Sequence, residues 1–235
     1  MNQPNALEKI TKLRALLKTQ FPEAHATGPV RTDSAGLEQQ RFGIPALDMQ
    51  GLPMNGGIVE VVSPGLSRGG GLLLSGLLES VLGRGGYAAL IDGQDSFDPG
   101  SLPEPLLKKM LWVRCKRTDQ APRCADLLLR DGNLPVVIAD LQFNAVKELQ
   151  RIPDSTWFRL RAQAETSGVL FFAFTPCKTI AGARLRLQVN QSFTLDALDT
   201  PRAELLSRMS ITSLRGQFDR LSAKILRVLD KTALF

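Results

Sequence analysis

The residues that could do chemistry are concentrated in a glycine-rich stretch, residues 51–71, which reads GLPMNGGIVEVVSPGLSRGGG. The β-branched run at 59–62 predicts a buried parallel strand, and the leucines at 72–74 predict the start of an apolar helix. A phosphate-binding loop occupies this place between a strand and a helix, because backbone N–H groups and the helix N-terminus favour an anion. The stretch therefore has the frame of a phosphate site.

The loop lacks the side chains that nucleotide chemistry needs. The pattern G-x-x-x-x-G-K-[ST] places a lysine on the phosphates and a hydroxyl on Mg²⁺. Gly69 and Gly70 stand at those two positions, and Arg68 replaces the preceding glycine. The backbone and the Arg68 cation could still hold an anion, and this alternative stays open. The degenerate loop consists of Ser63, Pro64, Gly65, Leu66, Ser67, Arg68, Gly69 and Gly70.

Other catalytic arrangements have little support in the sequence. His25 is the single histidine and lies in a polar segment, which argues against a Ser-His-Asp triad. Aspartates at strand ends are commonly structural caps, so we expect no metal site at Asp92, Asp95, Asp98 and Asp140. The spacing of the cysteines fits neither a disulfide framework nor a zinc site, which favours a reducing cytosol. They are Cys115, Cys124 and Cys177.

The composition is that of a globular protein of 235 residues with a formal charge of +6. This small surplus permits contact with nucleic acid or an acidic protein, and it also serves solubility. The longest apolar runs, at 72–78 and 168–174, are too short to span a bilayer. The N-terminus shows no secretory signal, so we expect a cytoplasmic protein without membrane contact.

Strands and helices alternate along the chain, which predicts an α/β sheet with right-handed crossovers. Strands are expected at 57–62, 87–92, 111–114, 135–140 and 168–174, with helices between them. Residues 184–189 alternate polar and apolar side chains, which predicts an antiparallel or edge strand with one wet face. Residues 193–198 are a candidate partner for that strand.

Two segments flank this core. Residues 1–40 predict an N-terminal helix and a polar linker, residues 41–200 the core, and residues 201–235 a C-terminal amphipathic helical tail. Each terminal helix either packs on its own domain or docks on a partner protein. The candidate partner-binding face of the tail consists of Leu214, Phe218, Leu221, Ile225 and Leu229.

Several segments together resemble the bacterial recombinase RecA. Residues 43–48 (GIPALD), 51–54 (GLPM) and 57–61 (GIVEV) are similar to that family's approach to its nucleotide loop. Residues 91–99 (IDGQDSFDP) are similar to its signature I-D-A-E-H-A-L-D-P, and the strand that ends at Asp140 takes the place of the Walker B acid. The resemblance covers residues 43–198. It implies a RecA-like core with a mainly parallel central sheet flanked by helices.

The departures from the family imply a pseudo-ATPase without ATP or Mg²⁺. Gln94 stands where the family has the acid that activates water, and an amide cannot take a proton at neutral pH. Losing two charge-assisted contacts at Gly69 and Gly70 would cost roughly 3–6 kcal/mol of binding energy. Asp140 then has no nucleotide-held Mg²⁺ to help bind.

Among RecA-like proteins without a working nucleotide site, the chain looks most similar to the ImuA group. That resemblance implies a non-catalytic adaptor in bacterial DNA damage tolerance and translesion synthesis, in contact with an ImuB-like Y-family polymerase homologue, with RecA, or with both. A SulA-like cell-division inhibitor is one alternative. A RecA-like DNA-binding recombination accessory protein is another, with Lys178, Arg184 and Arg186 as candidate phosphate contacts.

Overall fold

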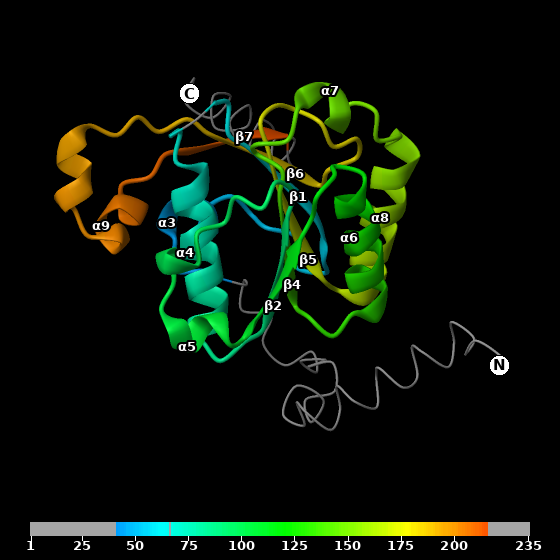
Figure 1. The fold of residues 1–235 in the computed structure, drawn as a ribbon, viewed down its shortest axis with the longest axis horizontal. Helices are drawn as coiled ribbons and strands as arrows, with labels where there is room; N and C mark the ends of the chain where they lie inside the picture. The colour runs from blue at the N-terminus through cyan, green and yellow to red at the C-terminus, as the bar shows by residue number, and fades with distance from the viewer. Residues whose placement is uncertain (1–40, 66, 216–235) are drawn as a thin grey trace, which may run out of the picture. The chain divides into compact units, whose positions relative to one another are not determined.

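The computed structural model describes residues 41–65 and 67–215. This part of the chain forms one sheet of seven strands in the order β3-β2-β4-β5-β1-β6-β7, and every neighbouring pair is parallel except β6 and β7 (Figure 1). The predicted α/β class with a mainly parallel central sheet is confirmed. The strands are β1 (Gly57–Val62), β2 (Ala88–Asp92), β3 (Met110–Arg114), β4 (Val136–Asp140), β5 (Leu170–Thr175), β6 (Leu185–Val189) and β7 (Ile211–Arg215).

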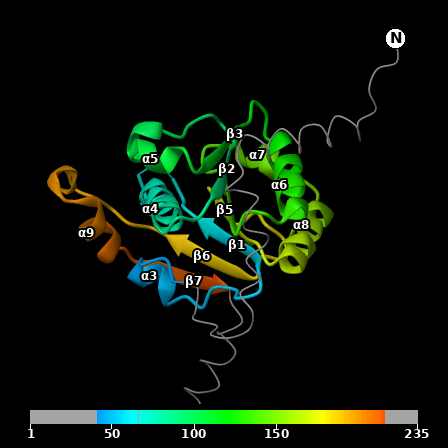
Figure 2. The same ribbon diagram turned by 90° about the horizontal axis from the view of Figure 1, so that it is seen from below.

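Helices cover both faces of the sheet (Figure 2). One face carries α3 (Pro45–Asp48), α4 (Gly70–Gly83), α5 (Glu104–Leu107) and α9 (Arg202–Ser207). The other carries α6 (Gln120–Asp131) and α8 (Asp154–Ser167). The shorter elements are α7 (Val146–Leu149) and the 3₁₀ turns η1 (Pro99–Ser101) and η2 (Leu195–Asp199).

The β-branched and aromatic strands form because both faces of the sheet are covered. Every residue of β1, β2, β4 and β5 is buried, as a strand between two helix layers requires. Helix α4 is apolar around most of its circumference, since it packs on the sheet and also on α9. Its Gly76 lets Leu206 approach closely: a Cβ there would lie 2.6 Å from Leu206 Cδ1.

The predictions from sequence for the region of β6 and β7 differ from the structure in three places. Strand β6 is not an edge strand, because it lies between β1 and β7, parallel to the first and antiparallel to the second. Residues 193–198 form no strand, and the antiparallel partner of β6 is β7. The expected helical tail over 201–235 is therefore wrong for residues 211–215, and Leu214 belongs to a strand. The expected N-terminal helix lies outside the described residues.

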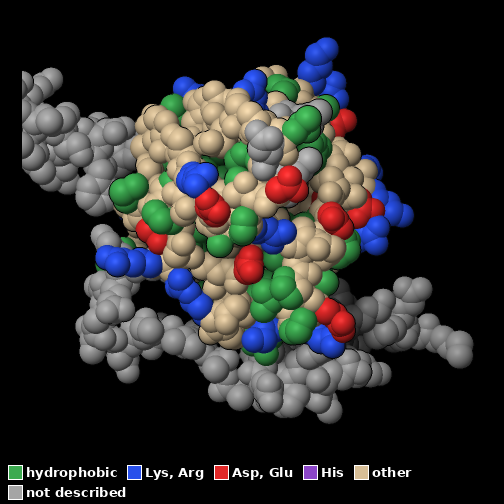
Figure 3. Space-filling view, turned by 90° about the vertical axis from the view of Figure 1, so that its left-hand side faces the viewer, with side chains coloured by type: hydrophobic (Ala, Val, Ile, Leu, Met, Phe, Trp, Pro, Cys, Tyr) green, Lys and Arg blue, Asp and Glu red, His purple; other side chains and the backbone are tan. Residues whose placement is uncertain are grey.

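The parallel strands bring their carboxyl ends to one edge of the sheet. Ser63, Gln94 and Asp140 follow or end three of these strands and lie at that edge. Ligands of open parallel sheets bind outside this edge. Acidic and basic side chains are interspersed over the side of the molecule that carries α3, α4, α5 and α9 (Figure 3). Among the described residues, no helix combines the length and apolar character that crossing a membrane requires.

Candidate functional site

The expected strand–loop–helix frame is present at the carboxyl end of β1. Strand β1 ends at Val62, and Gly69 caps the start of α4, whose first backbone hydrogen bond runs from Leu73 N to Gly69 O at 3.0 Å. The loop passes through left-handed backbone at Gly65 (φ 102°), Ser67 (φ 56°) and Gly69 (φ 88°). A left-handed conformation is uncommon for a serine, so the loop is tightly constrained at this point.

The position of the missing lysine is closed by neighbouring side chains. A Cβ at Gly69 would lie 3.1 Å from Gln191 Cβ and 3.2 Å from Val189 Cγ1, both tighter than ordinary contact. The Gln191 N–H donates to Arg68 O at 3.0 Å, which ties the loop to the segment after β6. The backbone at position 69 is therefore packed against protein.

The position of the missing hydroxyl is covered by Gln142. A Cβ at Gly70 would overlap Gln142 Oε1 and would lie 2.8 Å from Ser63 Oγ. The Gln142 amide is held there by its own bond, because Nε2 donates to Asp140 Oδ1 at 3.0 Å. An amide side chain thus fills the space over the first residue of α4.

The one cation of the loop is turned to the same neighbouring segment. The exposed Arg68 donates through Nη1 to Ser192 Oγ at 3.3 Å. Ser63 is buried at the end of β1, whereas Pro64 and Gly65 are exposed. The loop therefore offers exposed backbone at its tip and a closed wall at its α4 end.

Asp140 is buried at the end of β4, beside the loop. Burial raises the pKa of its carboxyl above the ordinary value, against hydrogen bonds from Gln142 that lower it, and nearby Asp92 adds to the rise. In this arrangement Asp140 carries an ionisation cost at neutral pH.

We expect Asp140→Asn to be more stable than the natural protein at pH 7. A folded-state pKa above the unfolded value contributes stability at low pH that is lost as the pH rises through the folded pKa. The asparagine keeps an acceptor for Gln142 and has no proton to lose. The gain should shrink as the pH falls toward about 4, near the unfolded pKa of aspartate. Urea unfolding at pH 4, 5 and 7 measures it, and a variant that is less stable at pH 7 would contradict the assignment.

Asp92, which ends β2, and Gln94, which follows it, have separate roles. Asp92 is fully buried and accepts hydrogen bonds from Phe97 N at 2.9 Å, Ser96 N at 3.0 Å and Trp112 Nε1 at 3.2 Å. It is a structural anchor for the loop that follows. Gln94 is exposed and lines a different cavity, described below. Across residues 41–65 and 67–215, no group of three or more His, Cys, Asp or Glu is placed to hold a metal ion.

The three candidate DNA contacts are in different surroundings. Lys178 is exposed after β5. Arg184 pairs with Glu165 at 3.1 Å between Nη1 and Oε1. Arg186 pairs with the buried carboxylate of Glu60, and its side chain is only 14% exposed, so its guanidinium is directed into the protein.

Glu60 is the polar residue that the sequence analysis missed. It lies fully buried in β1, next to Arg186 in the parallel register of β6. Its Oε1 accepts from Thr179 N at 2.6 Å, Ile180 N at 3.0 Å and Thr175 Oγ1 at 3.1 Å. A glutamate inside an otherwise β-branched run was the signal that could have identified it. Glu60 fixes the segment after β5 rather than a ligand.

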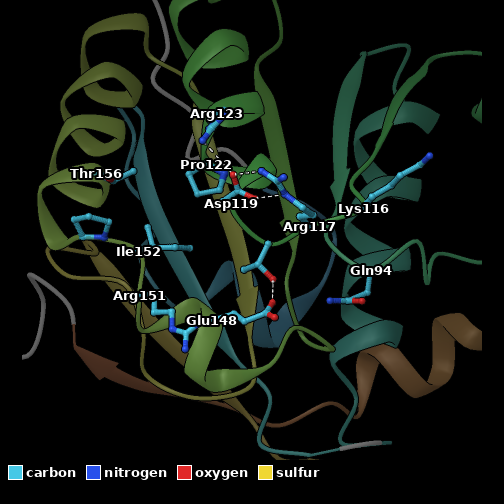
Figure 4. Close-up of a pocket in the computed structure, with 12 residues that line it drawn as sticks. Gln94, Lys116, Arg117, Asp119, Pro122, Arg123, Glu148, Arg151, Ile152 and Thr156 are labelled. Carbon is cyan, nitrogen blue, oxygen red and sulfur yellow. Dashed lines mark hydrogen bonds and ion pairs between the residues drawn. The ribbon is translucent and has the colours of Figure 1, made fainter.

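A second hollow lies at the same sheet edge, away from the glycine loop. A cavity of about 680 Å³ opens between the loops after β2 and β3, the start of α6 and the α7–α8 segment (Figure 4). Its base is a chain of hydrogen bonds in which Asn144 Nδ2 donates to Thr118 Oγ1 at 2.8 Å and Thr118 Oγ1 donates to Glu148 Oε2 at 2.5 Å. Sequence reasoning did not identify this site. The basic run at 114–117 (RCKR) was its only signal.

The predicted partner-binding face is only partly described. Leu214 is half-buried in β7, so it cannot continue the helical face proposed for the tail. Phe218, Leu221, Ile225 and Leu229 lie outside the described residues.

The fold and the edge together define an α/β protein with a glycine-rich strand–loop–helix segment whose α4 end is packed against its own side chains. Comparison with protein-family models finds no match, and comparison with curated proteins finds no significant match.

Proposed function

We propose that the chain is a non-catalytic RecA-like adaptor in bacterial DNA damage tolerance. In this role it acts in the cytoplasm through contacts with an ImuB-like Y-family polymerase homologue, with RecA, or with both. The observation that carries the proposal is the closed α4 end of the glycine loop, where Gln142 covers Gly70 and the segment after β6 covers Gly69. Neighbouring side chains therefore occupy the space that a lysine at position 69 and a threonine at position 70 would need.

Gln94 and Asp140, the two positions that the RecA resemblance assigns to hydrolysis, support the same conclusion. Gln94 cannot take a proton from water. Its side chain lines the second cavity and not the glycine loop. Asp140 is buried with a raised pKa and bonded to Gln142, an arrangement suited to a structural cap. ATP hydrolysis therefore has neither its binding contacts nor its base.

The RecA resemblance supports the biological setting of the proposal. The segments at 43–61 and 91–99 that carry the resemblance lie in and around α3, β1 and β2, in the sheet order given above. A scaffold that keeps this frame without its chemistry can still present surfaces to the proteins that work beside it. The mild positive charge permits an acidic partner.

The test is co-purification of the tagged full chain with the ImuB-like and RecA homologues of the same genome. We expect at least one to co-purify, and we expect Leu221→Glu with Ile225→Glu to weaken the complex by about tenfold if the tail docks by its apolar face. Leu127→Glu with Leu195→Glu is the matched control, since both leucines are exposed on the surface of the α/β domain.

Two outcomes are decisive for this proposal. Failure of both homologues to co-purify with the natural chain would overturn the adaptor function. Co-purification that the tail variant leaves unchanged would keep the function and remove the tail from the contact.

A further inference from the structure

The second cavity carries an excess of basic side chains over acidic ones. Arg117 and Arg123 share one carboxylate, Asp119, at 2.7 and 3.1 Å. Glu148 is engaged by the Thr118 hydroxyl. The remaining two cations are Lys116 and Arg151, both exposed, and neither forms an ion pair with a residue that the structure describes.

The arrangement of these cations leaves room for a ligand between them. Figure 4 shows Arg117 and Arg123 turned to Asp119 at the N-terminus of α6, Arg151 near Glu148 after α7, and Lys116 on the side of Gln94 with its side chain extended away from the other labelled residues. The cations thus come from separate elements, and the Lys116 side chain lies at the rim. A volume of about 680 Å³ accommodates several side chains of a bound segment.

Part of the wall between the cations is apolar. Pro122 on α6, Ile152 and Pro153 before α8 line the cavity together with Thr156. Apolar surface of this kind favours an aliphatic side chain, while the surrounding arginines favour carboxylates, with which guanidinium groups form paired hydrogen bonds. The complementary ligand combines acidic groups with an apolar anchor.

Nucleic acid fits this site less well than a peptide. Among residues 41–65 and 67–215, no aromatic side chain lines the cavity, and single-stranded nucleic acid is held largely by stacking on such side chains. An acidic peptide can place its carboxylates at the arginines and its aliphatic residue between them.

We propose that this cavity binds a short acidic peptide segment with an aliphatic anchor, contributed by a partner protein. The proposal rests on the adaptor function for the identity of the partner. The chemistry of recognition comes from the cavity itself, with Arg151 and Lys116 as the cations that gain a counter-charge on binding.

The direct test uses a fluorescein-labelled decapeptide that alternates glutamate pairs with leucines, titrated with the full chain by fluorescence polarisation. We expect Lys116→Glu with Arg151→Glu to weaken binding by about tenfold, since two exposed charged contacts together are worth on the order of 1–2 kcal/mol. Lys108→Glu with Arg208→Glu makes the same charge change at exposed positions elsewhere and should stay within about twofold. A peptide with serine for leucine should bind several-fold more weakly.

Other outcomes overturn the proposal. They are no binding of the acidic peptide by the natural chain, equal weakening in both double variants, or no effect of the cavity variant. Binding of a single-stranded oligonucleotide in place of the peptide, lost in the cavity variant, would assign the site to nucleic acid instead. Arg151→Ala, a truncation of one exposed side chain, should weaken peptide binding on its own and serves as the second variant if the double one folds poorly.

Co-purification separates this proposal from the adaptor function. If a homologue co-purifies equally with the natural chain and the cavity variant, the adaptor function stands and the cavity proposal fails. If the peptide binds through the cavity and neither homologue co-purifies, the cavity proposal stands and the adaptor function fails.

Discussion

Glu60→Ala is expected to lower the free energy of unfolding by about 3–5 kcal/mol, the usual effect of removing one partner of a buried ion pair. The carboxylate is fully buried and is engaged by the Arg186 guanidinium, two backbone N–H groups and the Thr175 hydroxyl. The alanine leaves a cation that is 14% exposed without its counter-charge and leaves Thr179 N and Ile180 N without their acceptor. Urea unfolding followed by tryptophan fluorescence measures the loss, and Trp157 is a buried reporter.

Two further variants separate the buried pair from a general effect of removing glutamate. Glu104→Ala removes the partner of Lys108 on the surface, where the side chains are 80% and 72% exposed, and it should cost about 0.5 kcal/mol or less. Glu60→Gln keeps an acceptor for the two N–H groups and removes the charge, so its loss should lie between the other two. A loss for Glu60→Ala no larger than that for Glu104→Ala would show that the pair contributes nothing to stability.

The sequence predicted the central elements because their signals are local. The β-branched run of β1, the glycines of the loop and the leucines of α4 lie within 27 consecutive residues, 57–83, and each follows from neighbouring side chains. The same holds for β5, whose run LFFAFT is buried throughout. Such strands need no knowledge of their partners to be identified.

The Glu60–Arg186 pair could not be predicted, because its members are 126 residues apart in the chain. Alternating arginines and leucines in β6 indicated an antiparallel or edge strand with one wet face, and the antiparallel pairing is present with β7. In the structure the polar face of β6 is directed at the segment after β5, where Arg186 also donates to Ile180 O at 2.8 Å. A single sequence does not distinguish water from a buried carboxylate as the partner of an arginine.

The prediction that Leu214 lies on a helix was wrong for a related reason. Spacings of three and four with residues after it suggested a helix, but β6 offered an antiparallel edge, and Leu214 lies in β7 at the irregularity of its pairing with β6. Tertiary pairing overrode the local pattern. The second cavity was missed because Thr118 follows β3 while Asn144 and Glu148 follow β4, and only the parallel sheet brings these two connections together.

The glycine loop shows the limit of motif reasoning. The pattern predicted which side chains are missing at positions 69 and 70. It did not predict that Gln142, from the loop after β4, stands over Gly70, or that Gln191 and Val189 stand against Gly69. The difference matters for experiment, because restoring the two side chains also requires the Gln142 side chain to move away from Gly70 and the neighbours of Gly69 to shift.

Gly69→Lys with Gly70→Thr is therefore expected to destabilise the protein without restoring nucleotide binding. A lysine at φ 88° carries backbone strain of about 1–3 kcal/mol, and a threonine that overlaps Gln142 adds overpacking of about 1–3 kcal/mol. Together they should lower the free energy of unfolding by about 2–6 kcal/mol. Isothermal titration with ATP and Mg²⁺ should detect micromolar affinity neither in the variant nor in the natural chain.

Gly71→Thr is the matched control, because it adds the same side chain one position further along α4, where a Cβ meets nothing within 4 Å. It should leave stability within about 0.5 kcal/mol or raise it, since glycine is the poorer helix former. Adding Gln142→Ala to the double variant removes the overlap at Gly70 and should recover part of the lost stability. Hydrolysis should still be absent, because Gln94 supplies no base. Micromolar ATP binding by the natural chain would refute the pseudo-ATPase proposal, and a stable double variant that binds ATP would show that the loop was open and lacked only its cation and hydroxyl.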